Sequence, residues 1–244
     1  MGTRLHSVVI DCHDHRAQAR WWAETLGWQL VHEDDDESTV APVGRPETDD
    51  LSLVFVPVPE PKRGKNRVHL DLNSPSAGAQ RDTVERLLDR GAAYADVGQT
   101  DVSWIVMTDL EGNEFCVLAP EQRFDEPGTL EAIVVDAQDP GGLARFWAEA
   151  TGWRISASSH LVATLRHPGD VPPALDLVSV AEPAPGKNRV HLDVAPAADD
   201  DQAAEVDRLR QLGAAPADVG QGDDITWVVL TDPEGNEFCV LGPR

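Results

Sequence analysis

The chain has 244 residues, of which 41% are hydrophobic and 26% charged, and its formal net charge is −23 at pH 7. This is a globular composition, and the length suffices for one large domain or two ordinary ones. The negative charge argues against nucleic acid and anionic membrane surfaces as partners, because both attract basic proteins. No apolar run is long enough to predict a membrane span, and the N-terminus shows no apolar signal region. Three cysteines, an odd number, predict reduced thiols, so we expect a cytoplasmic protein without disulfides.

An internal repeat dominates the sequence. The segment ARWWAETLGW at 19–28 returns as ARFWAEATGW at 144–153, and GKNRVHLDL at 64–72 returns as GKNRVHLDV at 186–194. EGNEFCVL at 111–118 returns unchanged at 234–241. Three segments in one order and at nearly one spacing indicate a tandem duplication. We therefore predict two domains, 1–122 and 127–244, joined near 121–128, where Pro120 and Pro127 bracket a polar stretch.

The sequence predicts the same series of secondary-structure elements in each copy. In the first copy a strand over 5–11 precedes a helix over 15–26, which Asp14 can cap and Gly27 can end. Strands follow at 28–32, 39–43 and 51–58. A second series has a strand at 67–73, a helix at 79–90 and strands at 103–108 and 114–118. The order is βαβββ twice in each copy, which gives four such modules in the chain.

The strand at 67–73 alternates strictly between polar and apolar residues. Arg67, His69 and Asp71 share one face, and the apolar residues between them need the helices. The polar face therefore looks either to solvent or into a cavity. The second copy repeats the pattern with Arg189 and His191, which favours the cavity.

The paired βαβββ modules, the VHLD strands and the closing EGNEFCVL hairpins resemble the vicinal oxygen chelate superfamily. This superfamily includes glyoxalase I, bleomycin-resistance proteins and extradiol dioxygenases. The resemblance covers nearly the whole chain and implies an α+β fold of tandem glyoxalase-like domains. Its four βαβββ modules would form two curved, mostly antiparallel sheets, one from each copy, with helices on their convex faces. Similar folds host many reactions, so the function has to be inferred from the residues of the site.

The resemblance also implies where a divalent metal would bind. Metal-using members draw ligands from the first, fourth, mid-domain and last strands of each domain. Neither copy has the usual set, since cysteine stands where a glutamate is expected. A set that contains a cysteine thiol, as in the first copy, would suit zinc. A set of carboxylates and one histidine, as in the second copy, is a harder, oxygen-rich alternative. The candidate ligands are His6, His69 and Cys116 in the first copy, and Glu131, Asp176 and His191 in the second, where Cys239 takes the glutamate position.

Other features have both a structural and a functional interpretation. Trp104 and Trp227 either pack in the core or form a stacking wall for a planar ligand. Arg67 and Arg189 either pair with nearby carboxylates or form an anion-recognising lip. Cys116 and Cys239 are either ligand contacts or small buried side chains.

Two functions remain open. The first is binding of a small, planar or aromatic molecule without a cofactor, in a resistance-type, sequestration or metabolite-binding role. The alternative is a metal-dependent lyase, isomerase or epimerase of the glyoxalase type, with His69, His191 or Glu131 as candidate catalytic residues. An extradiol dioxygenase is disfavoured, because neither copy supplies two histidines and a carboxylate. We expect a monomer or homodimer, with most of the purified chain free of tightly bound metal.

Overall fold

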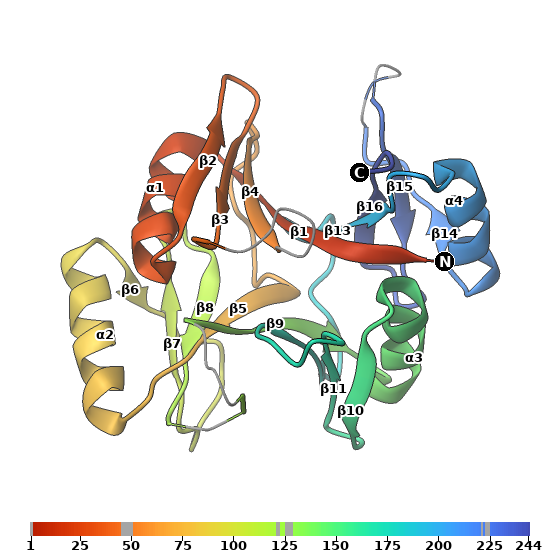
Figure 1. The fold of residues 1–244 in the computed structure, drawn as a ribbon. Helices are drawn as coiled ribbons and strands as arrows, with labels where there is room; N and C mark the ends of the chain where they lie inside the picture. Colours follow the sequence, from red (N-terminus) through yellow and green to blue (C-terminus); the bar gives the residue numbers. More distant parts are fainter. Residues whose placement is uncertain (1, 45–50, 121–122, 125–128, 221, 223–224) are drawn as a thin grey trace.

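The computed structural model describes residues 2–44, 51–120, 123–124, 129–220, 222 and 225–244. Within these ranges the chain forms four helices and two eight-stranded mixed sheets (Figure 1). None of these helices is both long and apolar enough to span a bilayer. The elements follow the predicted βαβββ order four times, so the α+β class and the four-module order are confirmed.

The first sequence copy contains two modules. Module 1 consists of β1 (Thr3–Cys12), α1 (His15–Leu26), β2 (Gln29–Glu33), β3 (Ser38–Ala41) and β4 (Ser52–Pro57). Module 2 consists of β5 (Val68–Leu72), α2 (Ala77–Asp89), β6 (Ala93–Tyr94), β7 (Ile105–Thr108) and β8 (Glu114–Val117). The sequence did not predict β6, because two residues are too short to show an alternation.

The second copy repeats the series. Module 3 consists of β9 (Leu130–Ala137), α3 (Pro140–Thr151), β10 (Arg154–Ser158), β11 (Val162–Arg166) and β12 (Ala174–Ser179). Module 4 consists of β13 (Val190–Pro196), α4 (Gln202–Gln211), β14 (Ala215–Pro216), β15 (Val228–Thr231) and β16 (Glu237–Val240).

Local chemistry fixes the ends of α1 as the sequence predicted. The side chain of Asp14 accepts a hydrogen bond from the Ala17 amide, which satisfies a donor of the first turn. Gly27 ends the helix with a φ of 69°, a left-handed conformation that glycine adopts without strain. Asp139 and Gly152 do the same for α3.

Each sheet combines modules from both sequence copies. Sheet A has the strand order β14-β15-β16-β13-β1-β4-β3-β2, and sheet B has the order β10-β11-β12-β9-β5-β8-β7-β6. Sheet A therefore joins modules 1 and 4, and sheet B joins modules 2 and 3. At the centre, β1 pairs antiparallel with β13, and β5 pairs antiparallel with β9.

Our expectation that each copy builds a sheet of its own is wrong. β5 and β13 carry nearly the same sequence, so pattern alone cannot say which of them pairs with β1. The boundaries 1–122 and 127–244 stay a prediction about units of sequence. Most of the expected junction, 121–122 and 125–128, lies outside the described residues.

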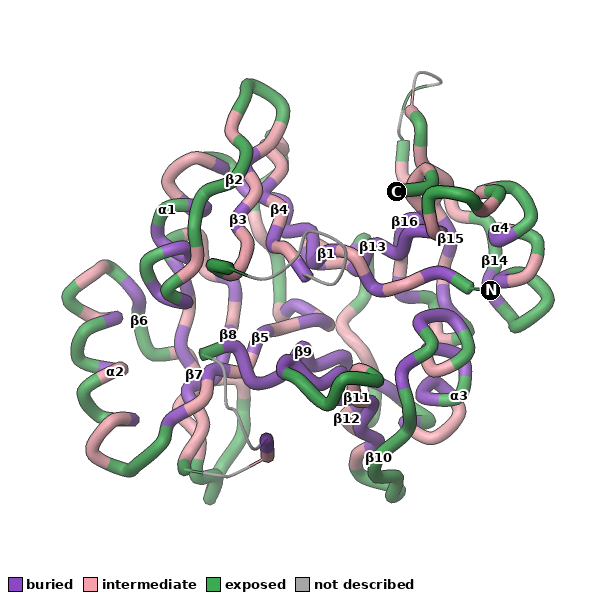
Figure 2. The backbone as a smooth tube through the Cα atoms, in the orientation of Figure 1, coloured by how far each residue is buried: buried purple, intermediate pink, exposed green. Residues whose placement is uncertain are grey.

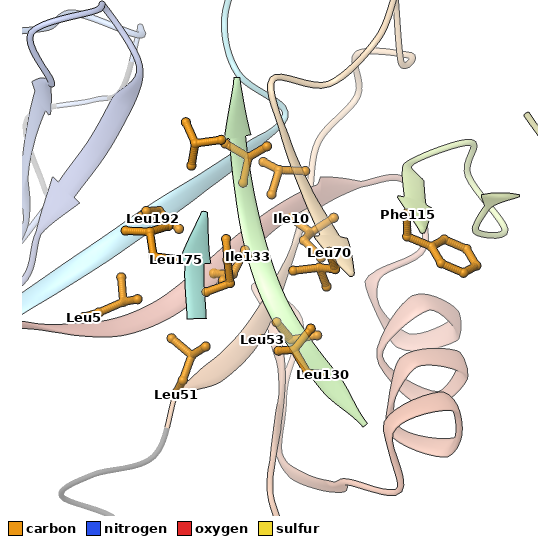
Figure 3. Packing of buried hydrophobic residues seen from close by; sticks show 14 of the residues in the cluster. Leu5, Ile10, Leu51, Leu53, Leu70, Phe115, Leu130, Ile133, Leu175 and Leu192 are labelled. Atoms are coloured by element: carbon orange, nitrogen blue, oxygen red, sulfur yellow. The ribbon is translucent and has the colours of Figure 1, made fainter. Parts of the chain in front are cut away.

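The two sheets share one hydrophobic core. Apolar side chains of their central strands, such as Ile10, Leu70, Ile133 and Leu192, lie in a single cluster between the sheets (Figure 3). The buried stretches of the backbone run through the middle of the molecule, and the helices flank them (Figure 2). The opposite face of each sheet points away from the helices and carries the polar side chains.

Candidate functional site

The polar face of sheet B lines a cavity of about 1100 Å³. Seven of the eight strands of this sheet contribute to it, from both modules. His69, Asp71 and Cys116 lie at its centre, and Trp104, Val106 and other apolar residues form part of its wall.

The central group of the cavity comes from two adjacent strands. His69 and Asp71 are two residues apart on β5, so their side chains share a face. β8 pairs parallel with β5 and places Cys116 next to Asp71. Nε2 of His69 lies 3.5 Å from Oδ1 of Asp71, and the donor atoms of all three residues lie within 4.8 Å of one another.

Sheet A carries the same group. His191 and Asp193 of β13 lie beside Cys239 of β16, again with all donor atoms within 4.8 Å of one another. Nε2 of His191 is 3.6 Å from Oδ1 of Asp193 and 3.6 Å from Sγ of Cys239. We call these two groups the His-Asp-Cys triplets. They are the groups of metal-ligating side chains found among the described residues.

Burial keeps the triplets close to electrically neutral. Desolvation lowers the pKa of His69 to about 3, with Lys65 as the second cause, and lowers the pKa of His191 to about 4. Desolvation also raises the pKa of Asp71 and of Asp193 to about 7. The pKa of the Cys116 and Cys239 thiols is raised for the same reason. Neutral imidazoles and thiols are therefore the resting forms at pH 7.

A lysine and a carboxylate flank each triplet. Lys65 contacts Asp136 at 2.7 Å beside the triplet of sheet B, and Lys187 contacts Asp11 at 2.7 Å beside that of sheet A. In both copies this lysine belongs to the GKNR segment, so the basic residues of that motif are paired within the fold.

Arg123 and Phe124, from the segment between the two copies, pack against module 3. Arg123 lines the cavity and donates two hydrogen bonds to the Asp176 carboxylate, at 2.8 and 3.0 Å. Its Nε lies 3.8 Å from Glu131, and Thr164 also donates to Asp176. Phe124 is buried against Ala132, Val134 and Ala174. The carboxylates that the sequence suggested as metal ligands are thus paired with an arginine.

The aromatic wall comes from a loop and a strand end. Trp104 lies just before β7, and its indole nitrogen donates to the Gln99 side chain at 3.0 Å. Both residues line the cavity, together with Val97. This hydrogen bond holds the indole in place at the edge of the cavity. Trp227 holds the corresponding position before β15 in sheet A.

The structure separates the metal-ligand sets suggested by the sequence. His6 lies in β1 of sheet A, whereas His69 and Cys116 lie in sheet B. Conversely, His191 belongs to sheet A, whereas Glu131 and Asp176 belong to sheet B. His6 and Glu131 both sit where the register of the central strand shifts, at equivalent irregularities of β1 and β9. The exchange of modules between sheets explains both separations.

The two arginines of the repeated motif lie at the junction between sheets. Arg189 donates to the backbone carbonyl of Glu60 and pairs with the Glu111 carboxylate at 3.0 Å. Arg67 donates to the backbone carbonyl of Ala184 and to the 235–236 turn. Arg189 thus pairs with a carboxylate, although one distant in the sequence, whereas Arg67 contacts backbone carbonyls and an amide oxygen.

Sequence reasoning missed three participants. Asp71 and Asp193 were visible on the polar face of the VHLD strands but were not considered as ligands. Their signal was the repetition of the spacing His-x-Asp in both copies. Arg123 had no signal, since it lies in a polar segment that appears once in the chain.

The comparisons with known proteins agree with this architecture. The model of a family described as "Glyoxalase-like domain" matches residues 7–118 and again 132–241. The chain belongs to the glyoxalase-like domain family.

The structure of the chain is similar to that of glyoxalase I from Zea mays, with 16% identity, a TM-score of 0.67, and coverage of 99% of this chain and 92% of that one. A putative dioxygenase from Bacillus subtilis subsp. subtilis str. 168 gives 14% identity, a TM-score of 0.62, and coverage of 100% and 86%. No curated protein in the comparison matches the chain. At these identities the likeness concerns the fold.

Proposed function

We propose that this glyoxalase-like protein binds a small, planar or aromatic molecule in the cavity of sheet B. The observation that carries the proposal is the cavity itself, which combines an apolar wall with many polar and charged side chains. Its volume of about 1100 Å³ lies slightly above the usual range of small-molecule sites, about 300–1,000 Å³. A resistance-type, sequestering or metabolite-binding role would follow from such binding.

The shape of the wall favours a flat ligand. The indole of Trp104 is held by Gln99, so it offers a fixed surface for stacking at little entropic cost. Val106 and Leu118 extend the apolar wall on the adjacent strands. At the centre, the neutral imidazole of His69 and the thiol of Cys116 can exchange hydrogen bonds with a polar edge of the ligand.

Ligand quenching of tryptophan fluorescence tests the proposal. Bleomycin and 8-anilinonaphthalene-1-sulfonate serve as probes of two sizes, titrated into the wild type and the Trp104→Leu variant. We expect saturable quenching by at least one probe in the wild type and at least a tenfold weaker affinity in the variant. Trp227→Leu is the matched control in sheet A and should leave that affinity unchanged. Equal affinities in all three proteins would reject the sheet B cavity as the site.

A metal-dependent lyase or isomerase is the second candidate. The observation in its favour is that each His-Asp-Cys triplet presents nitrogen, oxygen and sulfur donors to one point. These donors fit a zinc-type ion, and a bound ion would stabilise enolate-like charge on a substrate. His69 would serve as a ligand of this ion, so another base, such as Glu131 of β9, would accept or return the proton at the adjacent carbon.

Proton exchange would reveal this chemistry without knowledge of the substrate. An enolate-forming site should wash deuterium from D₂O into the carbon next to the carbonyl of simple ketones such as hydroxyacetone. The rate should fall at least a hundredfold in a His69→Gln variant. Exchange at the buffer rate with zinc-loaded wild type would exclude this candidate for such substrates.

A further inference from the structure

We propose that the ligand of the sheet B cavity carries an anionic group, a carboxylate or a phosphate, which Arg154 and Arg166 of module 3 bind. This ligand class rests on the proposed function, because it concerns the molecule bound in the same cavity. The two sheets would then take different ligands, since sheet A has no arginine at either of the equivalent positions.

One half of the cavity is repeated in sheet A. Module 2 supplies Lys65, a His-Asp-Cys triplet and Trp104 to the cavity of sheet B. Module 4 carries the same residue types at the equivalent positions of sheet A. A difference in what the two sheets bind is therefore expected from the opposite half, which module 3 forms in sheet B and module 1 forms in sheet A.

The strand register shows which residues of the two opposite halves are equivalent. In sheet B, Arg154 of β10 lies opposite Arg166 of β11, at the outer edge of the sheet. The equivalent hairpin of sheet A pairs β2 with β3, and there Gln29 lies opposite Ala41. The fold thus forms this hairpin without a charge at either position. Building the hairpin does not require the two arginines, which favours a role in binding.

The two arginines share a single carboxylate. Nη2 of Arg154 lies 2.6 Å from Oδ1 of Asp170, and Nη1 of Arg166 lies 3.0 Å from the same oxygen. Both arginines line the cavity, whereas Asp170 does not. Two guanidinium groups against one carboxylate leave one positive charge at this end of the cavity. An anionic group of a ligand would balance that charge through charge-assisted hydrogen bonds.

The other cations that line the cavity have carboxylates of their own. Lys65 pairs with Asp136 at 2.7 Å, and Arg123 pairs with Asp176 at 2.8 Å. All four of these residues line the cavity, so each pair is neutral within the lining. The positive charge of the arginine pair is not shared in this way.

Three further carboxylates of the lining could oppose an anion. Glu114 is paired with Lys62 at 2.8 Å. Asp71 lies on β5, three strands away from β11 in the order of sheet B. Glu182 lies after β12 and is exposed, so water screens its charge. The arginine end of the cavity therefore has a local excess of positive charge, in a chain whose net charge is −23.

Arg166 is held in place before any ligand binds. Its guanidinium carbon lies 4.5 Å from the centre of the Phe124 ring, and its Nη2 donates to the backbone carbonyl of Arg123. A guanidinium that is already fixed loses little side-chain entropy when an anion arrives. Arg154 complements it, because its side chain is 52% exposed and can turn toward the ligand.

The arginines and the aromatic wall lie toward opposite edges of the sheet. In the strand order of sheet B, β10 and β11 form one edge, and β7, which follows Trp104, lies next to the other edge strand. Residues from both ends line the same cavity. A ligand that spans the cavity would therefore place its planar part on Trp104 and its anionic group on Arg154 and Arg166. The class of molecule that fits is an elongated aromatic acid.

Calorimetric titration of the full chain with three biphenyl probes tests this ligand class. Biphenyl-4-carboxylate and biphenyl-4-yl phosphate carry an anionic group, and biphenyl-4-carboxamide is a neutral molecule of nearly the same shape. We expect at least one anionic probe to bind about tenfold more tightly than the amide. The tighter of the two anionic probes shows whether the site prefers a carboxylate or a phosphate.

The residues of sheet A supply the matched substitutions. Arg154→Gln combined with Arg166→Ala should weaken the anionic probe about tenfold and leave the affinity for the amide unchanged. If circular dichroism shows that this double variant is unfolded, Arg154→Gln alone replaces it, with an expected loss of about threefold. A merely structural role of the arginines would weaken all three probes alike.

Asp170→Asn should act in the opposite direction. It removes the carboxylate that competes for both arginines, so the affinity for the anionic probe should rise about threefold. Asp170 has a φ of 53°, and asparagine tolerates this left-handed conformation, so the backbone can stay as it is. Weaker binding of the anionic probe by this variant would contradict the proposed competition.

Arg145→Gln is the control for general electrostatic attraction, because Arg145 is exposed on α3 and does not line the cavity. It should leave all affinities unchanged, and a loss equal to that of Arg154→Gln would overturn the arginine site. Equal affinities for the anionic probes and the amide would overturn it too, while the proposed function would stand. Binding of none of the probes would reject both. Anion binding that Trp104→Leu does not weaken would support the arginines and remove the aromatic wall from the proposed function.

Discussion

The indole nitrogen of Trp22 in α1 donates a hydrogen bond to Oδ2 of Asp109, 3.2 Å away in the turn between β7 and β8. Oδ1 of the same aspartate accepts the backbone amides of Glu111 and Asn113, each at 2.9 Å. Trp147 and Asp232 repeat the first contact at 3.3 Å in the second copy. The repeated turn motif before each FCVL strand thus ties a helix of one module to the hairpin of another.

The first prediction concerns this buried aspartate. Asp109→Ala removes an acceptor from at least three donors that are then buried without a partner. We expect it to lower the free energy of unfolding by about 3 kcal/mol. Asp109→Asn keeps one acceptor oxygen and should cost less, and Asp232→Ala should match Asp109→Ala. Urea unfolding measures all three, and a cost below about 1 kcal/mol for both alanine variants would contradict the interpretation.

The second prediction concerns the carboxylates at the start of the helices. Glu111 accepts the amides of His13 and Asp14 before α1, and Glu234 accepts those of Gln138 and Asp139 before α3. Glu111 also pairs with Arg189, whose side chain is 10% exposed, and so connects the two sheets. Glu111→Gln should therefore destabilise the chain by about 1 kcal/mol more than Glu234→Gln. Equal losses in thermal unfolding would show that the arginine contributes nothing.

Much of the fold could be predicted from the sequence, because its signals are local. Helix α1 begins and ends where Asp14 and Gly27 predicted it would, and the alternation in VHLD gave the polar face of β5. The pairing of β1 with β13 could not be predicted, since β5 offers almost the same residues in the same order. The ligand sets suggested by the sequence combined residues of different sheets because this pairing was not predicted. His69 and Cys116 were recognised individually, but the sheet in which they lie depends on which module is the neighbour.

The third prediction follows from this exchange of modules. Each sheet joins the two sequence copies through its central strand pair, so neither copy can complete a sheet alone in the arrangement seen here. Fragments 1–122 and 127–244, expressed together, should purify as a 1:1 complex. Each fragment alone should be unfolded or form a homodimer, in which a second copy supplies the missing module. Sedimentation equilibrium distinguishes these outcomes, and a stable, folded monomer of either fragment would contradict the prediction.

The fourth prediction is a pH dependence that originates at His6. Burial lowers the pKa of this imidazole to about 4, and the charges of Arg244 and Arg4 lower it further. The unfolded chain, with a histidine pKa near 6.5, therefore binds the proton more readily than the folded chain between these two values. The contribution of neutral His6 to the free energy of unfolding is therefore fully present above pH 6.5. It is lost as the pH falls toward 4, because the unfolded chain takes up the proton first.

Because His6 is partly exposed, we expect this loss to be about 2 kcal/mol at most. Asp71 and Asp193, whose pKa is raised to about 7, act in the opposite direction over the same range, since protonation favours their folded state. The pH dependence of the wild type alone therefore does not isolate the contribution of His6. The informative quantity is the difference in the free energy of unfolding between wild type and His6→Gln at each pH. That difference should shift in favour of the variant as the pH falls from 7 to 4. A parallel His160→Gln variant, at an exposed position, should show no such shift. Two pH profiles that stay parallel for His6→Gln would mean that water reaches the imidazole and its proton is not excluded by the fold.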